Sequence, residues 1–308
     1  MNPLRQEAVD YLAVRRALGF KLTGHDRLLE SFLTFSEQTG DGSISIVGAV
    51  AWATSPAGRS PIRSVQRLTV VRGFARQLAC FDPTVQVPPV DLLDASYQRR
   101  TPYLYRERDI VRLLAAAGNL RPLFRASTVR TFFGLLAATG MRLGEAVRLD
   151  RDDVDLDAGL LTITNTKFRK HRTLPLHPST VTALREYAQA REEFSRRPKA
   201  PSFFLSTRKN RLQTAAVHYA FGQLLPALEL PAHPGSGQPH IHDLRHTFAV
   251  ATVREWYRSG AVLDGKLPIL SAYLGHADPI STYWYLQACP ELLALAADRL
   301  THRTGQGR

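Results

Sequence analysis

A cluster of prolines between residues 81 and 102 places the strongest constraint on how this chain of 308 residues can fold. The segment FDPTVQVPPVDLLDASYQRRTP contains Pro83, Pro88, Pro89 and Pro102. Proline has no backbone N–H and its ring clashes with the preceding helical turn, so prolines at this density exclude a helix and favour an extended linker. We therefore predict two domains, residues 1–82 and 103–308, joined by a linker at 83–102.

Apolar residues on both sides of this linker recur at helical intervals. In the first domain they are Tyr11, Leu12, Val14 and Leu18, then Leu28, Leu29, Phe32, Leu33 and Phe35, then Val65, Leu68, Val71, Phe74 and Leu78. In the second domain we expect helices near residues 107–117, 128–138, 142–148, 179–194, 214–228, 242–258, 267–274, 279–285 and 290–300. The β-branched residues on both sides of a basic turn in DLDAGLLTITNTKFRKHRTLPLH predict a hairpin. The predicted fold is mainly α with one small β-hairpin.

Charge gives the first indication of function. The net charge is +13, of which residues 1–98 contribute +1 and the remainder +12. A domain with this surplus repels itself unless it meets a polyanion, and nucleic acid is the commonest one. The chain has no apolar run long enough for a membrane span, and its start does not look like a signal peptide. The two cysteines, Cys80 and Cys289, are expected to be small buried side chains in a reducing cytoplasm rather than a disulfide or metal site.

Three short stretches contain residues suited to binding a phosphate. In ATGMRLGEAVRL, Gly140 allows a turn, Arg142 opens a helix, and Glu145 lies on the same helical face as Arg142. The predicted hairpin turn TKFRKHRTLPL contains Lys167, Arg169, Lys170, His171 and Arg172. In HIHDLRHTFA, His242 and Arg245 share one face of a helix that begins near residue 242. Each stretch alone is more often a solvated surface feature.

Two further stretches follow in the chain. YLGHADPISTYWYL contains His276 just after Gly275, and Tyr285 nine residues later. ELLALAADRL, residues 291–300, carries an apolar stripe at helical spacing. The order of all five stretches is the strongest signal in the sequence.

From residue 5 to 300 the sequence resembles the tyrosine recombinase (phage integrase) family. The resemblance rests on TG-x-R-x-x-E, K-x-x-K-x-R-x-x-P-L, H-x-L-R-H and LGH-(x)8-Y, all present in this order. It implies a catalytic set, which here is Arg142, Lys167, His242, Arg245, His276 and the nucleophile Tyr285, supported by Glu145. It also implies a helical, SAM-like core-binding domain and an α+β catalytic domain that form a C-shaped clamp on DNA.

The implied reaction breaks and rejoins double-stranded DNA through a 3′-phosphotyrosyl bond, with no metal, other cofactor or ATP. His242 is the expected base and Lys167 the expected acid, with Glu145 supporting either His242 or Arg142. Tyr283 is a rival nucleophile, and family spacing favours Tyr285. Residues expected to contact DNA phosphates without reading sequence are Arg169, Lys170, Arg172, Arg208, Lys209 and Arg211.

Some features differ from the commoner Xer-like members of the family. The stretch from Arg245 to His276 is long, with residues 256–268 as the expected insertion, which suggests a recombinase of a transposon or integrative element. The expected role is movement of a mobile element in the bacterial cytoplasm, at the nucleoid. The expected assembly is a homo-oligomer on DNA, a tetrameric synapse, with other recombinases or accessory proteins as further partners and no membrane.

Three alternatives stay open. A type IB topoisomerase shares the nucleophile chemistry, and a DNA-binding regulator could use the same fold without cutting. The apolar stripe at 291–300 is expected to form an exchange helix that docks on a neighbouring protomer, and the alternative is that it packs on its own domain.

Overall fold

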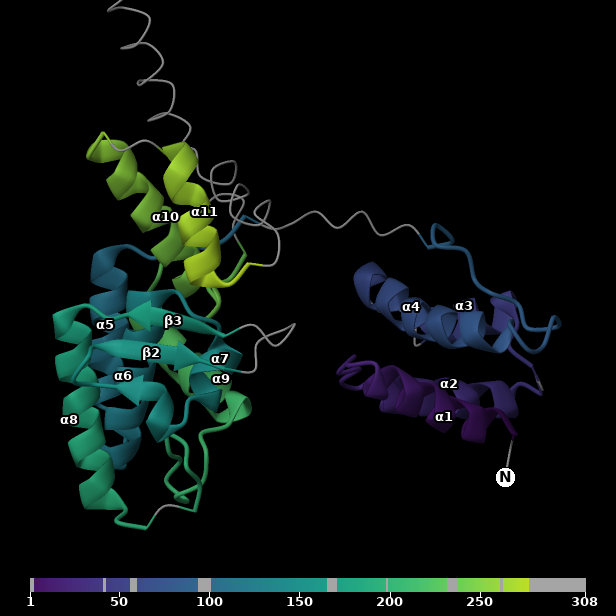
Figure 1. The fold of residues 1–308 in the computed structure, drawn as a ribbon, viewed down its shortest axis with the longest axis horizontal. Coiled ribbons are helices and arrows are strands. Elements are labelled where there is room, and N and C mark those ends of the chain that lie inside the picture. The colour runs from purple at the N-terminus through teal and green to yellow at the C-terminus, as the bar shows by residue number, and fades with distance from the viewer. Residues whose placement is uncertain are drawn as a thin grey trace, which may run out of the picture. The chain divides into compact units, whose positions relative to one another are not determined.

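The computed structural model of the protein describes residues 3–40, 43–55, 60–93, 101–164, 171–197, 199–231, 237–260 and 263–276. The chain divides into two compact units, residues 1–99 and 100–308, each with its own hydrophobic core. Figure 1 shows the helices and strands of both units. No helix among the described residues is both long and apolar enough to cross a membrane.

The first unit is helical, with α1 (Pro3–Ala17), α2 (His25–Gln38), α3 (Ile46–Thr54) and α4 (Pro61–Leu78). The hydroxyl of Ser45 caps α3 by accepting from the N–H of Gly48 at 3.0 Å, and Pro61 occupies the first turn of α4, where no N–H is needed. The buried faces of the four helices meet around Phe32, Trp52 and Phe74. Burying side chains of this size contributes about 1.5–3 kcal/mol each to the stability of the unit.

The start of the proline-rich segment belongs to this unit. The guanidinium of Arg72, on α4, is buried and donates to the carbonyls of Pro88 at 2.8 Å and Pro89 at 2.6 Å. The N–H of Gln86 donates to the carbonyl of Ile44 at 3.0 Å, and Val85 is part of the core. Prolines leave carbonyls without helical partners, and here Arg72 supplies the missing donors.

The second unit is built from helices around one small sheet. Its helices are α5 (Glu107–Gly118), α6 (Leu123–Thr139), α7 (Leu143–Arg148), η1 (Arg151–Asp153), α8 (Pro178–Phe194), α9 (Thr214–Leu224), η2 (Leu225–Leu228), α10 (Asp243–Arg258) and α11 (Leu263–Leu274). The sheet is antiparallel, in the order β1 (Val154–Asp155), β2 (Leu160–Ile163), β3 (Arg172–Pro175). In its register Leu161 pairs with Leu174 and Ile163 with Arg172.

Helix α6 lies at the centre of this unit and packs against α5, α8 and α10. Phe132, Phe133, Leu135 and Leu136 are all buried, so the helix is covered on nearly every side. Ring pairs such as Phe132 with Phe204, 5.0 Å apart edge to face, fill the space between α6 and the segment that follows α8. This core holds the ends of α6, α7 and α10 in fixed positions.

The structure confirms the predicted fold class, a mainly helical chain with a small antiparallel sheet, and corrects several details. Val14 and Leu18 belong to the apolar pattern of the first predicted helix but are 50% and 67% exposed, because α1 ends at Ala17 and buries the face that carries Ala8, Tyr11 and Leu12. Cys80 was expected to be buried and is exposed. The expected insertion at 256–268 is not one loop, since α10 runs to Arg258 and α11 begins at Leu263.

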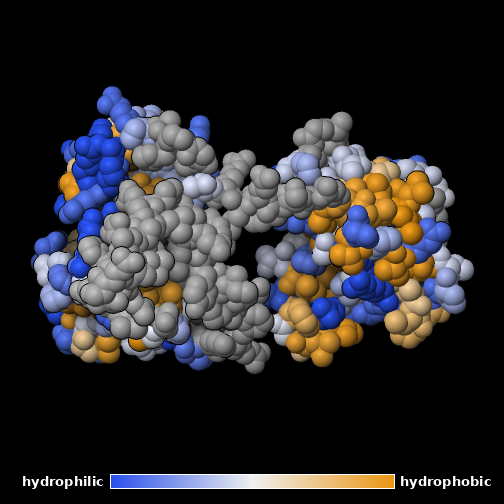
Figure 2. All heavy atoms as spheres, turned by 90° about the horizontal axis from the view of Figure 1, so that it is seen from above, coloured by the Kyte–Doolittle hydropathy of each residue, from blue (hydrophilic) through white to orange (hydrophobic). Residues whose placement is uncertain are grey.

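The helical unit exposes large apolar side chains. Figure 2 shows apolar residues gathered on the face of this unit seen from above. The exposed large apolar residues of the unit are Val9, Val14, Leu18, Phe20, Val47, Phe81, Val90 and Leu92. Contiguous apolar surface on a folded domain often marks a contact with another protein.

Candidate active site

Gly140 ends α6 and sets the direction of the chain into the site. It has φ +60°, a left-handed conformation that glycine adopts without strain. A Cβ at this position would lie 2.5 Å from the Cδ1 of Phe248, so the turn also packs too closely on α10 for any side chain. Two residues later, Arg142 stands immediately before the first residue of α7, as its sequence motif predicted.

Glu145 organises the start of α7. Its carboxylate accepts the backbone N–H of Arg142 at 2.9 Å and a guanidinium N–H of Arg142 at 3.0 Å. It also accepts two N–H groups of Arg172, at 3.1 and 2.7 Å, and its side chain is only 3% exposed. Burial acts to raise the pKa of this carboxyl, but the hydrogen bonds and charges of the two arginines outweigh burial and hold the pKa below its ordinary value. Glu145 is therefore an anion that fixes the two arginines.

Arg245 lies on the first turn of α10 and is buried. Its guanidinium donates to the carbonyls of Gly140 at 2.8 Å and Leu274 at 2.9 Å. His242 stands immediately before α10, on the exposed side, with its ring 4.7 Å from that of His246. The prediction that His242 and Arg245 lie at the start of one helix is confirmed.

The C-terminal end of α11 brings these arginines together. Three consecutive carbonyls there accept from three arginines: Tyr273 from Arg172 at 2.9 Å, Leu274 from Arg245 at 2.9 Å, and Gly275 from Arg142 at 2.8 Å. The last carbonyls of a helix have no helical partner and carry its negative dipole end, so they attract cations. His276 follows directly, and its N–H donates to the carbonyl of Ser271 at 3.0 Å.

Among the described residues, the network thus joins three arginines to the one carboxylate of Glu145. Arg142 is the most accessible of them, with 40% of its side chain exposed. One carboxylate cannot neutralise three guanidinium groups, so this network keeps a positive surplus. Such a site is suited to a phosphate group, whose oxygens accept paired N–H donors.

Several predicted site residues lie outside the described residues. They are Lys167, Arg169, Lys170, Tyr283 and Tyr285. The apolar stripe at 291–300 and Cys289 also lie outside them. Their roles remain predictions of the sequence motif.

The remaining basic residues that were expected to contact DNA fall into two groups. Arg208 and Lys209 are exposed in the turn before α9, and no salt bridge involves them in the part of the chain that the structure describes. Arg211 instead donates to the carboxylate of Asp150 at 2.5 Å and to the carbonyl of Val147 at 3.1 Å. Arg172 is likewise held inside the site. Arg211 and Arg172 therefore brace the fold from inside, whereas phosphate binding by Arg208 and Lys209 stays a prediction.

Two residues that the sequence analysis did not single out hold the start of α10. The hydroxyl of Tyr105 donates to the carbonyl of His240 at 3.0 Å, and its N–H donates to the hydroxyl of Thr247 at 3.0 Å. The carboxylate of Asp243 accepts the N–H of His240 at 2.8 Å, and burial raises the pKa of this carboxyl. Tyr105 is 135 and 142 residues away in sequence from these two partners, and no local pattern indicates such contacts. Asp243, in the first turn of a helix, could have been recognised as a capping residue.

No group of three or more His, Cys, Asp or Glu side chains in the described ranges is arranged to hold a metal ion.

Comparison with known proteins agrees with this geometry. The model of the phage integrase family matches residues 104–291. The putative integrase/recombinase y4rB of Sinorhizobium fredii is 41% identical over 309 residues, covering 98% of both chains. Among solved structures, the Tn1549 transposon integrase in complex with transposon right end DNA has a TM-score of 0.66 at 17% identity, covering 97% of this chain and 99% of the other. A lambda integrase tetramer bound to a Holliday junction has a TM-score of 0.62 at 16% identity, covering 92% and 76%.

Proposed function

This chain belongs to the phage integrase family and is a tyrosine-type DNA recombinase, and from this premise we propose that it cleaves and rejoins DNA during the movement of a mobile element. The observation that carries the proposal is the convergence of Arg142 and Arg245 on the adjacent carbonyls of Leu274 and Gly275, next to His276. Two guanidinium groups held on adjacent backbone carbonyls suit the scissile phosphate of DNA, whose oxygens accept paired N–H donors.

The first step is stabilisation of the phosphate. As Tyr285 attacks, negative charge builds on the non-bridging oxygens of the phosphorus. Arg142 and Arg245 donate hydrogen bonds to these oxygens, and His276 adds a third donor. Donors that are already in place when the charge develops are each worth on the order of 10²–10³ in rate.

The bonds that form and the bonds that break balance one another, and no cofactor is needed. The phenol oxygen of Tyr285 forms a bond to phosphorus, and the bond from phosphorus to the 5′ oxygen breaks, which leaves a 3′-phosphotyrosyl link. His242 accepts the phenol proton, whose ordinary pKa is about 10, and Lys167 gives a proton to the departing 5′ oxygen. The link keeps the energy of the phosphodiester, so a 5′-hydroxyl of another strand reverses the step without ATP.

Glu145 supports Arg142 in this scheme. The structure gives it hydrogen bonds from Arg142 and Arg172, and this favours support of Arg142 over support of His242, the alternative that the sequence left open.

Binding of the duplex involves both units. We assign non-specific phosphate contacts to Arg208 and Lys209, and add Arg169 and Lys170 from the sequence motif. The helical unit binds the opposite side of the duplex and completes a clamp, with the proline-rich segment spanning between the units. Such a protein acts where the DNA is, in the bacterial cytoplasm at the nucleoid.

Assembly on DNA follows from the reaction. Exchange between two duplexes cuts four strands, so we propose a homo-tetramer on DNA, in which residues 291–300 dock on a neighbouring protomer. A heterologous exchange of this kind can close into a ring. Other recombinases or accessory proteins could join the complex.

The experiment uses DNA fragments that carry the ends of the element flanking the gene, incubated in EDTA. A recombinase joins strands from two fragments and needs both sites. A topoisomerase would relax a supercoiled plasmid that lacks the sites, and a regulator would bind the fragments without any product; either result would overturn the proposal. The chain truncated after Pro290 should still bind one site but should lose strand exchange, and normal exchange would rule out the docking role of residues 291–300.

A further inference from the structure

Arg172 is the first residue of β3 and reaches across to two other elements of the site. Its two terminal N–H groups donate to the two carboxylate oxygens of Glu145, on α7, at 3.1 and 2.7 Å. Its Nε donates to the carbonyl of Tyr273, on α11, at 2.9 Å. The side chain is 13% exposed, so the guanidinium is directed into the protein and away from solvent.

Each oxygen of Glu145 is shared between Arg172 and Arg142. Oε1 accepts an Nη1 hydrogen from both arginines, at 3.1 and 3.0 Å. Oε2 accepts Nη2 of Arg172 at 2.7 Å and the backbone N–H of Arg142 at 2.9 Å. Because the carboxylate is divided in this way, Arg142 can keep Nη2 on the carbonyl of Gly275 at 2.8 Å.

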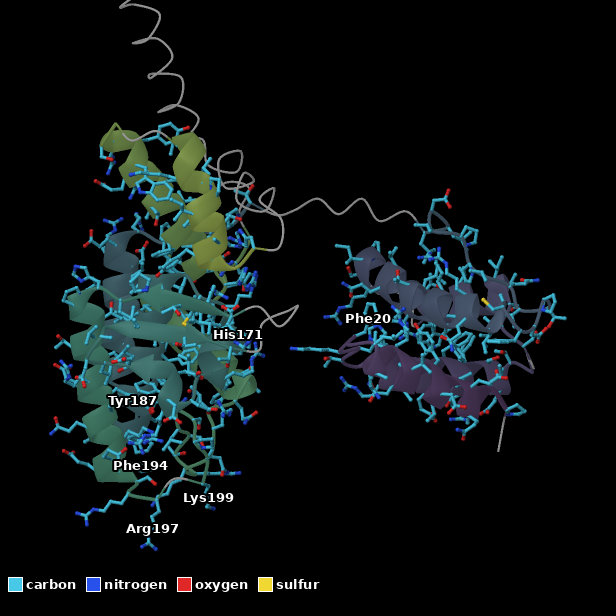
Figure 3. The ribbon with its side chains drawn as sticks, in the orientation of Figure 1. Phe20, His171, Tyr187, Phe194, Arg197 and Lys199 are labelled. Carbon is cyan, nitrogen blue, oxygen red and sulfur yellow. The ribbon has the colours of Figure 1, made fainter. Side chains whose placement is uncertain are left out.

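The turn before His276 is shaped around Arg172. Gly275 has φ +70°, and a Cβ on it would lie 2.6 Å from Nη1 and 2.8 Å from Cζ of Arg172. The guanidinium therefore packs directly on the backbone of Gly275, and a larger residue there would displace it. Figure 3 labels His171, the residue before Arg172, at the edge of the small sheet, and Figure 1 shows α7 and the end of α11 on the same side.

We propose that Arg172 is a positioning residue that aims Arg142 at the scissile phosphate and fixes the turn carrying His276. The inference rests on the proposed function, in which Arg142 and His276 contact that phosphate. Without Arg172, the carboxylate of Glu145 is left to Arg142 alone, and a guanidinium prefers to pair with both oxygens of one carboxylate. The guanidinium of Arg142 then turns toward Glu145 and no longer points at the scissile phosphate.

Arg172 also connects the hairpin to this site. It follows Lys167 by five residues and opens the strand that continues from that segment. The side chain of Arg172 therefore connects the start of β3, which follows the segment with the proposed acid Lys167, to the residues that bind the phosphate.

The test replaces Arg172 by lysine, which keeps the charge but loses the planar fork. Single-turnover formation of the covalent adduct is measured on a nicked suicide substrate. Loss of a positioning partner costs about 10–100-fold in activity, and DNA affinity should stay within about 3-fold of wild type.

A second substrate separates positioning from a general structural role. A methylphosphonate at the scissile position replaces one charged oxygen by a neutral methyl group, so cleavage depends less on Arg142. If Arg172 acts by aiming Arg142, the defect of Arg172→Lys should shrink to within about 3-fold on this substrate, because less charge has to be stabilised.

Arg191→Lys is the matched control. Arg191, on α8, is buried and donates to a carboxylate oxygen of Glu192 at 2.9 Å and to the carbonyl of Ser202 at 3.0 Å, outside the site. This variant should lower the melting temperature while cleaving at the wild-type rate below its melting point, on both substrates.

Two results would overturn the inference. One is wild-type cleavage by Arg172→Lys, and the other is an equal defect on both substrates, which would mean that Arg172 acts only through the stability of the domain. If Arg172→Lys is unfolded by circular dichroism, Glu145→Gln takes its place in the same comparison and decides in the same way. If the wild-type protein forms no adduct on the phosphodiester, the proposed function itself fails.

Discussion

At the scale of single residues, the site depends on one buried carboxylate. Glu145 receives four N–H groups, three from side chains and one from the backbone, and these keep it ionised although it is buried. A buried carboxylate with this many donors is costly to neutralise or remove, because its partners lose their acceptor as well. Its charge is therefore as important for the arrangement of the arginines as its shape.

This gives a prediction for pH. The folded pKa of Glu145 is below its ordinary value of 4.5, so the stability that its ionisation contributes is fully present above pH 4.5 and is lost as the pH falls through the folded pKa. Glu145→Gln should lower the free energy of unfolding at pH 7 by roughly 1–3 kcal/mol, and this difference should shrink below pH 4.5. Urea unfolding of both proteins across the pH range measures it.

Asp157→Asn is the control, since Asp157 pairs with Arg185 at 3.4 Å on the surface, where both side chains are more than half exposed. Its effect should be below about 1 kcal/mol. A Glu145→Gln difference that stays constant from pH 7 to pH 3 would show that the charge of Glu145 does not matter.

At the scale of elements, the site is assembled where three helix ends meet: the end of α6, the start of α10 and the end of α11. Gly140 makes this meeting close, because its missing side chain lets α6 end against Phe248 of α10 and Leu274 of α11. The arginines then join the helix ends through backbone carbonyls. Backbone acceptors hold the guanidinium groups whatever side chains surround them.

Gly140→Ala tests this packing. The added methyl would be 2.5 Å from Phe248 and 3.1 Å from Leu274, in a left-handed backbone conformation, so we expect a loss of about 2–4 kcal/mol in the free energy of unfolding. Gly222→Ala, on α9, is the matched control: nothing lies within 4 Å of its Cβ, and alanine should stabilise the helix by about 0.5–1 kcal/mol. If Gly140→Ala and Gly222→Ala changed the free energy of unfolding equally, the contact between α6 and α10 at Gly140 would not be close.

The sequence predicted most of the helices and the hairpin, because apolar spacing and glycine turns are local signals. It placed Arg142 and Arg245 in the site from their motifs, and Glu145 beside Arg142 from helical spacing. It assigned Arg172 to DNA, because a basic turn looks the same whether its arginines face solvent or a buried carboxylate. The contacts of Arg172 with Glu145 and Tyr273 span 27 and 101 residues, and no local pattern contains them.

At the scale of the whole molecule, the charge is concentrated beyond residue 98, where the sequence carries +12 of its +13. Part of this surplus is internal, since Arg142, Arg172, Arg211 and Arg245 hold the fold and the site together. The exposed part, including Arg208 and Lys209, is available to phosphates. Net charge alone therefore overstates the number of DNA contacts.

Salt dependence separates the two kinds of arginine. Each phosphate contact contributes about 0.9 to the slope of log affinity against log salt. Arg208→Ala and Lys209→Ala should each lower that slope by about this amount in a binding titration with non-specific DNA. Arg185→Ala removes the same charge from an exposed residue that pairs with Asp157, and should leave the slope unchanged. If all three variants change the slope equally, binding follows total charge and not these positions.

The central claim, that the protein joins itself to DNA through Tyr285, is tested most directly by trapping the covalent adduct on a nicked suicide substrate in EDTA. Wild-type protein and Tyr283→Phe should form the adduct, and its digest should contain a DNA-linked peptide that includes Tyr285. Tyr285→Phe should form none, while its DNA affinity stays near wild type because only one oxygen is lost. The account would be contradicted if Tyr285→Phe formed the adduct, or if Tyr283→Phe were the one protein of the three that formed none.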